Sequence, residues 1–322
     1  MFLLAGDVGG THTRLIYAEA NSGGQAVLAE KHYLSAEHSD LVTIIEIFLA
    51  EHHISTAIDA ACIAVAGPVK SGVASVTNLP WLISEQQLSQ LLHTPRVKLV
   101  NDFVAAAYGL SELKASEMLV LQAAEVGEGD KLNPDDAIIG AGTGLGAAHL
   151  VWLNNHYQVY PSEAGHAGFA PENELQCELL AWMQNQHSHV SLEMLLSGKG
   201  LVNIYRFIYE AKGIAESPAI HAAMKNSDPS RVITDAALAD GDNLCQQTLD
   251  CFIDIYAAAA GNIALHYYPI AELYIAGGIA PKIQSQLTGQ RFIDAFRNKG
   301  LMSSNRSEER RVGKECRSRW SP

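Results

Sequence analysis

The stretch FLLAGDVGGTHTRL (Phe2–Leu15) and the stretch AIIGAGTGLGAAHL (Ala137–Leu150) decide the fold, because each runs from an apolar strand through a glycine-rich turn into a second strand. Glycine lets backbone N–H groups approach an anion closely, and successive N–H groups cradle a phosphate. Each stretch therefore predicts a β-hairpin with a candidate phosphate site at its turn. The alternative for either stretch alone is an ordinary tight hairpin.

Two other phosphate motifs do not fit these turns. Neither turn is followed by the Gly-Lys-Ser/Thr of a Walker A loop, and the second leads into a strand rather than the helix of a dinucleotide-binding fold. A strand–turn–strand start that is repeated in two parts of one chain indicates two similar domains that grip a phosphate chain from both sides of a cleft.

The order of strands and helices predicts an α/β protein. Apolar strands at Ala60–Ala66 and Arg96–Val100 alternate with helices in the first part of the chain, as in a sheet with helices packed on it. The second part is mostly helical after its hairpin. We expect helices near Glu172–Gln186, Leu201–Lys212, Ile233–Asp240 and Asn243–His266. A strand is expected after them at Glu272–Ala276.

Two helix starts in the first part carry capping signals. Ser39 precedes a helix whose apolar face covers Leu41–Leu49, and we expect Ser39 to cap it. Ser84 and Gln87 have the spacing of a capping box for a helix that reaches about Leu92.

Composition bounds the class of protein. The 322 residues suffice for two hydrophobic cores, and the net charge of −13 argues against nucleic acid or an anionic membrane surface as a partner. We expect no membrane span and no signal peptide, because the apolar runs are short and no basic region precedes them. Five scattered cysteines without a Cys-x-x-Cys pair fit a cytoplasmic protein and give no zinc signal.

The last residues differ from the rest. The stretch RSEERRVGKECRSRWSP (306–322) holds six basic and three acidic residues and has neither helical nor strand periodicity. It resembles the in-frame translation of a sequencing adapter, so we expect a non-native tail at 306–322; the alternative is a basic disordered tail. The expected domains are then a small α/β domain at 1–110 and a large α/β domain at 111–305.

Polar residues at the ends of strands are the candidate chemical groups. Asn101 and Asp102 directly follow the strand that ends at Val100, and open α/β sheets place ligands at the carboxyl ends of strands. Asp102 is a candidate base that takes a proton from a substrate hydroxyl as it attacks phosphorus. Its alternative is a helix cap, a position that Asp and Asn both favour.

Other candidates lie on turns. Glycine and proline favour a loop rather than a helix around Glu163 and His166, which suits hydrogen bonds to sugar hydroxyls; the alternative is a solvated loop. Glu193 begins a short helix, where it could simply complement the helix dipole. Asn78 lies in a turn before Trp81. The turn at Gly277–Gly278 fits either backbone packing or a close approach to adenosine.

Seven motifs, taken together, resemble those of bacterial ATP-dependent glucokinases of the hexokinase/actin-like superfamily. The resemblance runs from about Leu4 to about Ser303. The motifs are GDVGGTHTRL (Gly6–Leu15), TNLPW (Thr77–Trp81), NDF (Asn101–Phe103), GAGTGLGAAHL (Gly140–Leu150), PSEAGHAGFAP (Pro161–Pro171), EMLLSGKGLVNIYR (Glu193–Arg206) and YIAGGI (Tyr274–Ile279).

This resemblance implies a two-domain actin-like (RNase H-like) fold with an interdomain cleft for ATP and sugar, and it implies a role for each motif. Asp102 would be the catalytic base, and Asp7 would lie near Mg²⁺, through water. The sugar-binding set would be Asn78, Asn101, Asp102, Glu163, His166 and Glu193. The nucleotide-binding set would be Gly6, Asp7, Val8, Gly9, Gly10, Thr11, Gly142, Thr143, Gly144, Gly277 and Gly278.

The expected function is phosphorylation of glucose by ATP, with glucose and ATP as partners. A kinase for another hexose and an actin-like ATPase without kinase activity stay open as alternatives, and a homodimer is one option for the assembly. The family continues with a further strand and helix after the point where this sequence departs from it. We therefore expect uncovered apolar surface and reduced stability for this chain.

Overall fold

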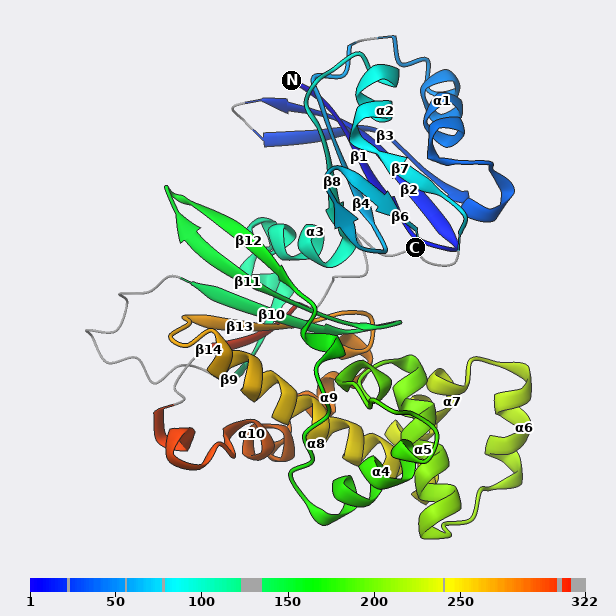
Figure 1. Ribbon diagram of the computed structural model, residues 1–322, viewed down its shortest axis with the longest axis vertical. Helices are drawn as coiled ribbons and strands as arrows, with labels where there is room; N and C mark the ends of the chain where they lie inside the picture. The colour runs from blue at the N-terminus through cyan, green and yellow to red at the C-terminus, as the bar shows by residue number, and fades with distance from the viewer. Residues whose placement is uncertain are drawn as a thin grey trace. The chain divides into compact units, whose positions relative to one another are not determined.

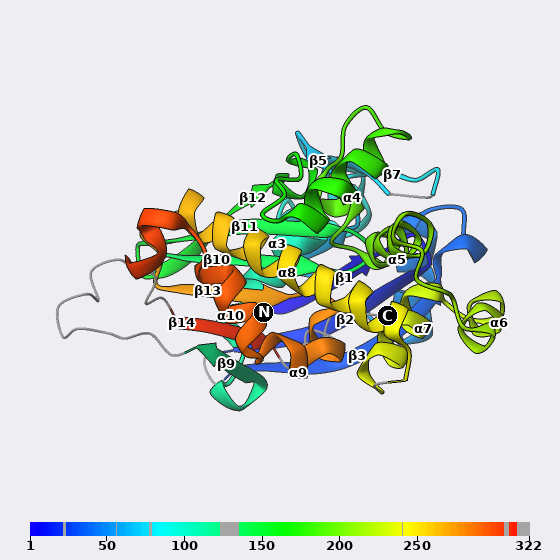
Figure 2. The ribbon, with the colours of Figure 1, turned by 90° about the horizontal axis from the view of Figure 1, so that it is seen from below.

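The computed structural model describes residues 1–21, 24–55, 57–76, 79–122, 135–239, 241–305 and 309–313. The chain forms two compact units, of which the first is Met1–Leu110 and the second begins at Ser111. Figure 1 labels most of the helices and strands of both units, and Figure 2 labels β5.

The first unit is built on a five-stranded sheet in the order β3-β2-β1-β4-β8 and a three-stranded sheet in the order β5-β6-β7. β1 pairs with β2 and β2 with β3 in antiparallel fashion, whereas β1, β4 and β8 run parallel. The strands are β1 (Phe2–Val8), β2 (His12–Asn21), β3 (Gly24–Leu34), β4 (Ala60–Val65), β5 (Val69–Lys70), β6 (Val73–Ser75), β7 (Leu82–Ser84) and β8 (Val97–Asn101).

The α-helices in the described part of this unit are α1 (Leu41–Glu51), α2 (Glu85–Leu91) and α3 (Asp102–Gly109). The apolar face of α1 buries Ile44, Ile45 and Phe48 in the core of the unit. The helix positions agree with the sequence prediction. The predicted Ser39 cap was wrong, and Ser84 holds the predicted N-cap position without a side-chain capping bond.

Asp40, not Ser39, caps α1, because its carboxylate accepts a hydrogen bond from the Thr43 N–H at 2.8 Å. Ser39 bonds instead to the Thr43 hydroxyl. Ser84 stands at the N-cap of α2 but makes no side-chain capping bond there. It is also the last residue of β7, where its backbone pairs with Val73.

The second unit is built on a six-stranded sheet in the order β12-β11-β10-β13-β14-β9. Its strands are β9 (Met118–Gln122), β10 (Asp136–Ala141), β11 (Leu145–Leu153), β12 (His156–Ser162), β13 (Glu272–Ala276) and β14 (Glu309–Gly313). The backbone of β14 pairs with β13 and β9, so the stretch after residue 305 contributes a strand that its residue pattern did not predict.

Helices make up most of the remainder of this unit. They are α4 (Glu174–Gln184), α5 (Gly198–Lys212), α6 (Pro218–Asn226), α7 (Pro229–Leu238), α8 (Asn243–His266), α9 (Gln284–Leu287) and α10 (Gln290–Arg297). Short 3-10 turns lie at η4 (Ala164–His166), η5 (Leu192–Met194) and η6 (Ala280–Ile283). η4 contains His166, η5 contains Glu193, and η6 follows Gly277–Gly278. His166 is therefore the last residue of a 3-10 turn, and Glu163 is the residue directly before that turn.

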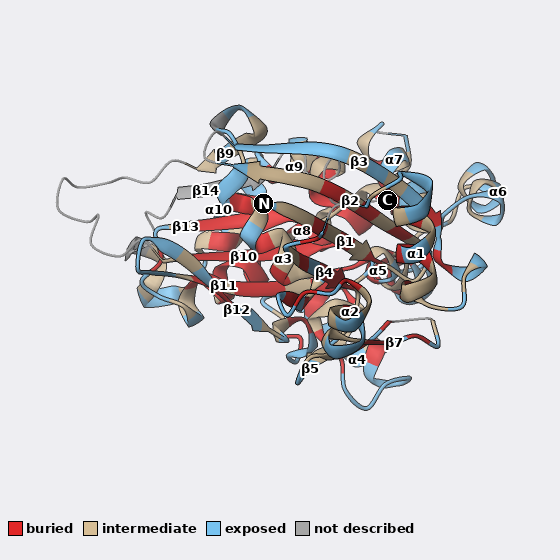
Figure 3. Ribbon diagram, turned by 90° about the horizontal axis from the view of Figure 1, so that it is seen from above, coloured by how far each residue is buried: buried red, intermediate tan, exposed pale blue. Residues whose placement is uncertain are grey.

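Helix α8 is the core of the second unit. It contacts β10 and β13 and lies along the sheet (Figure 2), and buried residues are concentrated in these three elements (Figure 3). It is long and apolar enough to cross a bilayer by length and composition alone, which corrects the prediction that no stretch reaches that length. Because 78% of its most apolar window is buried inside the unit, α8 has the character of a core helix.

Both predicted glycine hairpins are confirmed. β1 and β2 pair from Phe2–Glu19 to Val8–Thr13, and β10 and β11 pair from Asp136–Leu150 to Ala141–Leu145. In each case the strands extend further toward the turn than the apolar runs suggested.

Candidate functional site

The parallel strands of the first unit bring two carboxylates to one edge of the sheet. Val8 pairs with Val65, and Val65 pairs with Asn101, so β1, β4 and β8 end at the same level. Asp7 lies one residue before the end of β1, and Asp102 is the first residue of α3 directly after β8. A single edge of the sheet therefore presents both acidic groups.

Their surroundings raise the pKa of both carboxyls. Burial, and then the negative charge of Asp102, raises the pKa of Asp7 to about 6, while Arg14 opposes the shift. Burial also raises the pKa of Asp102, although its side chain stays open to solvent on one side. The hydrogen bond from the Phe103 N–H, at 2.8 Å, counteracts this by favouring the ionised form. Asp102 is thus an accessible carboxylate with enhanced affinity for a proton.

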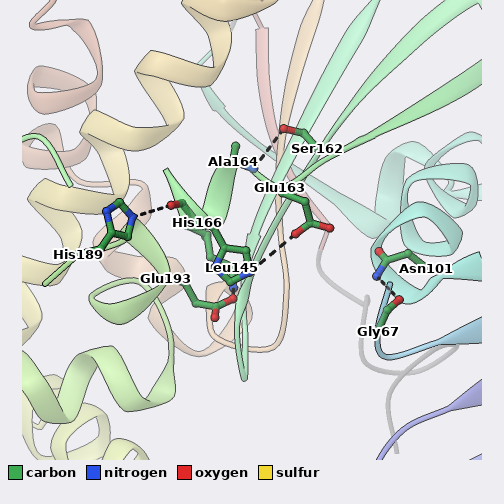
Figure 4. Close-up of polar contacts among 9 residues, drawn as sticks. All are labelled: Gly67, Asn101, Leu145, Ser162, Glu163, Ala164, His166, His189 and Glu193. Carbon is green, nitrogen blue, oxygen red and sulfur yellow. Dashed lines mark hydrogen bonds and ion pairs between the residues drawn. The ribbon is translucent and has the colours of Figure 1, made fainter. Parts of the chain in front are cut away.

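Asn101 takes the capping role that was the alternative for Asp102. Its Oδ1 accepts the Phe103 N–H at 2.9 Å, and its Nδ2 donates to the carbonyl oxygen of Gly67 at 3.3 Å (Figure 4). These bonds fix the residue that precedes Asp102. Gly67 follows β4 and lies 34 residues before Asn101 in the sequence, so no local pattern predicts this contact.

Hydrogen bonds to both backbone groups of Gly9 fix the first glycine turn. The Gly9 N–H donates to His12 at 2.9 Å, and the Ser35 hydroxyl donates to the Gly9 carbonyl, also at 2.9 Å. Gly6 lies within β1, where a Cβ would come 2.8 Å from Ile63 Cδ1, so a larger residue would require the buried Ile63 side chain to shift. Val8, predicted to bind the nucleotide, has no exposed surface, and its carbonyl oxygen accepts a hydrogen bond from the Ala66 N–H at 2.9 Å.

The second unit places two glycine turns side by side. A Cβ on Gly142 would lie 3.8 Å from the Gly278 nitrogen, and a Cβ on Gly277 would lie 2.3 Å from the Ala141 carbonyl oxygen. Gly277 also has a φ of 84°, a conformation that favours glycine. The turn is closed by the Gly142 N–H, which donates to Gly144 at 2.8 Å.

Leu145, the first residue of β11, joins this turn to the predicted sugar-binding residues. Glu193 Oε2 accepts the Leu145 N–H at 2.9 Å. A Cβ on Gly165 would lie 2.2 Å from the Leu145 carbonyl oxygen, so the turn between Glu163 and His166 packs against the same residue. Figure 4 shows the side chains of Glu163, His166 and Glu193 around Leu145.

The two turns that carry these side chains are bonded to each other. Leu192 N–H donates to Ala167, Phe169 N–H donates to Val190, and His189 Nε2 lies 2.9 Å from the His166 carbonyl oxygen. Glu163 and His166 are largely exposed and lie 3.8 Å apart. Exposed polar groups on a braced backbone suit hydrogen bonding to a polyhydroxylated ligand. Asn78, the remaining sugar-binding candidate, lies outside the described residues.

Comparison with solved structures defines the class of fold. The chain superimposes on a ROK family glucokinase from Streptomyces griseus in complex with glucose and AMPPNP with a TM-score of 0.59 at 20% identity, over 92% of this chain and 89% of that one. It superimposes on a glucokinase from an Antarctic psychrotroph with a TM-score of 0.80 at 32% identity, over 97% and 94% of the two chains. The fold is the actin-like ATPase fold of sugar kinases, as predicted.

Sequence comparison identifies the family within that class. The family model described as Glucokinase matches residues 4–308. A glucokinase from Nostoc sp. (strain PCC 7120 / SAG 25.82 / UTEX 2576) is 43% identical over 316 residues, which cover 93% of this chain and 91% of the relative. The chain belongs to the glucokinase family. This assignment favours the kinase over the actin-like ATPase without kinase activity that the sequence had left open.

Proposed function

We propose that this chain transfers the γ-phosphate of ATP to the 6-hydroxyl of glucose, giving glucose 6-phosphate and ADP. Family membership supports the reaction, and the structure of the Streptomyces griseus relative with glucose and AMPPNP supports this pair of ligands. The observation that carries the proposal in this chain is the exposed carboxylate of Asp102 at the edge of the sheet, with a raised pKa.

Asp102 is the proposed general base. A sugar hydroxyl is a weak nucleophile, so a carboxylate that accepts its proton as the oxygen attacks phosphorus contributes about a hundred- to ten-thousand-fold in rate. Asn101 positions this carboxylate, because it caps α3 and is itself bonded to Gly67.

The second unit supplies the proposed sugar hydroxyl contacts and a phosphate turn. Glu163, His166 and Glu193 accept or donate hydrogen bonds to the other hydroxyls of the sugar, so that the 6-hydroxyl is the one left to react. Thr143 and Gly144 offer backbone N–H groups to the phosphates. The Gly277–Gly278 turn lies beside the adenosine.

The carboxylates of Asp7 and Asp102 fit a site for Mg²⁺ held with the nucleotide. Burial raises the pKa of both carboxyls, and the charge of Asp102 raises the pKa of Asp7 further. A nearby cation would therefore offset unfavourable negative charge. Among the described residues, no group of three His, Cys, Asp or Glu side chains forms a metal cage. We propose that Asp7 holds the ion through water. An ion held there would neutralise negative charge on the phosphates.

The reaction is proposed to take place in the cytoplasm. Cys62, Cys177, Cys245 and Cys251 are free thiols, which fits a reducing compartment.

A coupled assay for glucose 6-phosphate with ATP, Mg²⁺ and a panel of hexoses tests the proposal. Glucose should give the highest kcat/KM, and EDTA should abolish turnover. A much higher kcat/KM with another hexose would move the assignment to a kinase for that sugar.

Asp102→Asn tests the base. The variant should lose at least about a hundredfold in kcat while its affinity for glucose stays within about tenfold. Asp40→Asn is the matched control, because it changes another carboxylate at a helix start of the same unit and keeps a good cap. Near-normal kcat in Asp102→Asn would remove Asp102 from this role.

A further inference from the structure

Tyr256 is a buried polar residue that no motif of the sequence pointed to. It lies in the middle of α8 with no exposed surface. Its hydroxyl accepts a hydrogen bond from the Ala141 N–H at 3.1 Å and donates one to the Ala276 carbonyl oxygen at 3.3 Å. A phenol is both a donor and an acceptor, so one hydroxyl satisfies both backbone groups.

These two backbone groups end neighbouring parallel strands. The last paired residues of β10 and β13 are Gly140 and Ala276. The direct pairing of β10 and β13 ends at that pair. Beyond it, the hydroxyl of Tyr256 bridges the two strands. Each strand then enters a glycine turn, Gly142–Gly144 after β10 and Gly277–Gly278 after β13.

The same point is fixed from other directions. The Ile279 N–H donates to the Ala141 carbonyl oxygen at 3.2 Å, and the Gly198 N–H donates to Gly142 at 2.9 Å. Both polar groups of Ala141 are therefore bonded, one to Tyr256 and one to Ile279. The N–H groups of Thr143 and Gly144 take no part in these bonds.

The aromatic ring of Tyr256 is held as firmly as its hydroxyl. Phe252 and Phe292 contact it edge to face, with ring centroids 5.9 and 6.4 Å away. Because close-packed aromatic rings have few alternative positions, α8 sets where the hydroxyl lies. The hydroxyl in turn sets the spacing of the two strand ends.

We propose that Tyr256 is a positioning residue for the nucleotide, one that fixes the two glycine turns of the second unit at the separation that phosphate and adenosine require. This inference rests on the proposed function for its ligand. Tyr256 touches neither substrate. It acts through Ala141 and Ala276, so its loss should affect the nucleotide and spare the sugar.

The test replaces Tyr256 with phenylalanine, which keeps the ring and removes the hydroxyl. Hydrogen exchange of the full chain without ligands should become about tenfold faster in the peptides that span residues 137–146 and 272–279. The Kd for Mg²⁺–AMPPNP, measured by calorimetry, should rise about three- to tenfold, as expected for the loss of a buried hydrogen bond. The Kd for glucose should change less than twofold.

Tyr205→Phe is the matched control. Tyr205 is 3% exposed, and its hydroxyl donates to Glu216 Oε1 at 3.0 Å, a residue that belongs to neither turn. This variant should lose a comparable amount of thermal stability without any change in turn exchange or in nucleotide affinity. Equal effects of the two variants on AMPPNP binding would overturn the proposal and leave Tyr256 with a purely structural role.

Failure of the inference differs from failure of the proposed function. Unchanged exchange in both turns of Tyr256→Phe overturns the inference, whether or not the protein phosphorylates glucose. A parent chain that binds no AMPPNP contradicts the proposed function, while hydrogen exchange still decides whether Tyr256 holds the turns.

Discussion

Replacing Asp136 with asparagine should remove a large pH-dependent contribution to the stability of the second unit. Asp136 opens β10 and is 3% exposed. Its carboxyl accepts hydrogen bonds from the Tyr157 hydroxyl at 2.5 Å and from the Glu272 N–H at 3.0 Å. Burial raises its pKa to about 7, and the charge of Glu272 adds to the shift against the opposing effect of the Tyr157 bond.

The direction and size of the effect follow from this shift. The folded state binds the proton more tightly than the unfolded state, whose carboxyl has the ordinary value of 3.8. The stabilisation is therefore complete below pH ~4, falls as the pH rises toward about 7, and is lost above that value. At about 1.36 kcal/mol per pKa unit, the full shift is of the order of 4 kcal/mol.

The assay is native-state hydrogen exchange of α8, because the slowest amides of this buried helix report unfolding of the second unit alone. Between pH 4.5 and pH 8, the free energy of unfolding of the parent should fall by several kcal/mol relative to Asp136→Asn. Tyr157→Phe removes a bond that lowers the pKa of Asp136, so it should extend the decline to higher pH. A constant difference between parent and Asp136→Asn over this range would refute the reasoning.

Two further substitutions test local geometry. Gly277→Ala should cost about 1–3 kcal/mol of unfolding free energy, because φ is 84° and the new Cβ would lie 2.3 Å from the Ala141 carbonyl oxygen; thermal unfolding unchanged from the parent would contradict this. Asp40→Ala should cost about 1 kcal/mol through loss of the cap on the Thr43 N–H, whereas Asp40→Asn should cost little. Urea unfolding compares the two, and equal losses would show that the cap contributes nothing.

Elements with strong local signals could be predicted from the sequence. The bounds expected for α8 and β13 are those found, since α8 follows an Asp242 cap on the Cys245 N–H and β13 is a short apolar run before two glycines. The glycine hairpins were found for a similar reason. In each of these cases residues that are adjacent in sequence determine the structure.

Other elements were missed although their signals were present. The start of α6 carries Ser217 as a cap and Pro218 at the first helical position, a combination typical of a helix N-terminus. β12 follows a two-residue turn in which Asn154 and Asn155 both have positive φ, as a tight hairpin requires. Both elements have few buried residues, so hydrophobic periodicity, which guided the prediction, is weak in them.

In the candidate site, too, features set by neighbouring residues could be predicted, whereas contacts between distant residues could not. Asp102 and the glycine turns follow strands directly, so the order of residues predicts their place at the edge of a sheet. The braces behind them come from distant parts of the chain: Glu193 lies 48 residues from Leu145, and Tyr256 lies 115 residues from Ala141. Within α8, Tyr256 has the pattern of an ordinary core residue, and only packing shows that its hydroxyl is used.

This difference explains what a glycine-rich turn contributes and what it does not. Glycine removes the Cβ and permits many backbone conformations, so the GAGTG pattern allows a phosphate cradle but selects no single geometry. In the second unit, selection comes from bonds to Ala141, Gly142 and Leu145, made by Tyr256, Ile279, Gly198 and Glu193. A sequence that kept the glycines and lost these partners would keep the motif and lose the fixed turn, so affinity for nucleotide should follow the braces as closely as the motif.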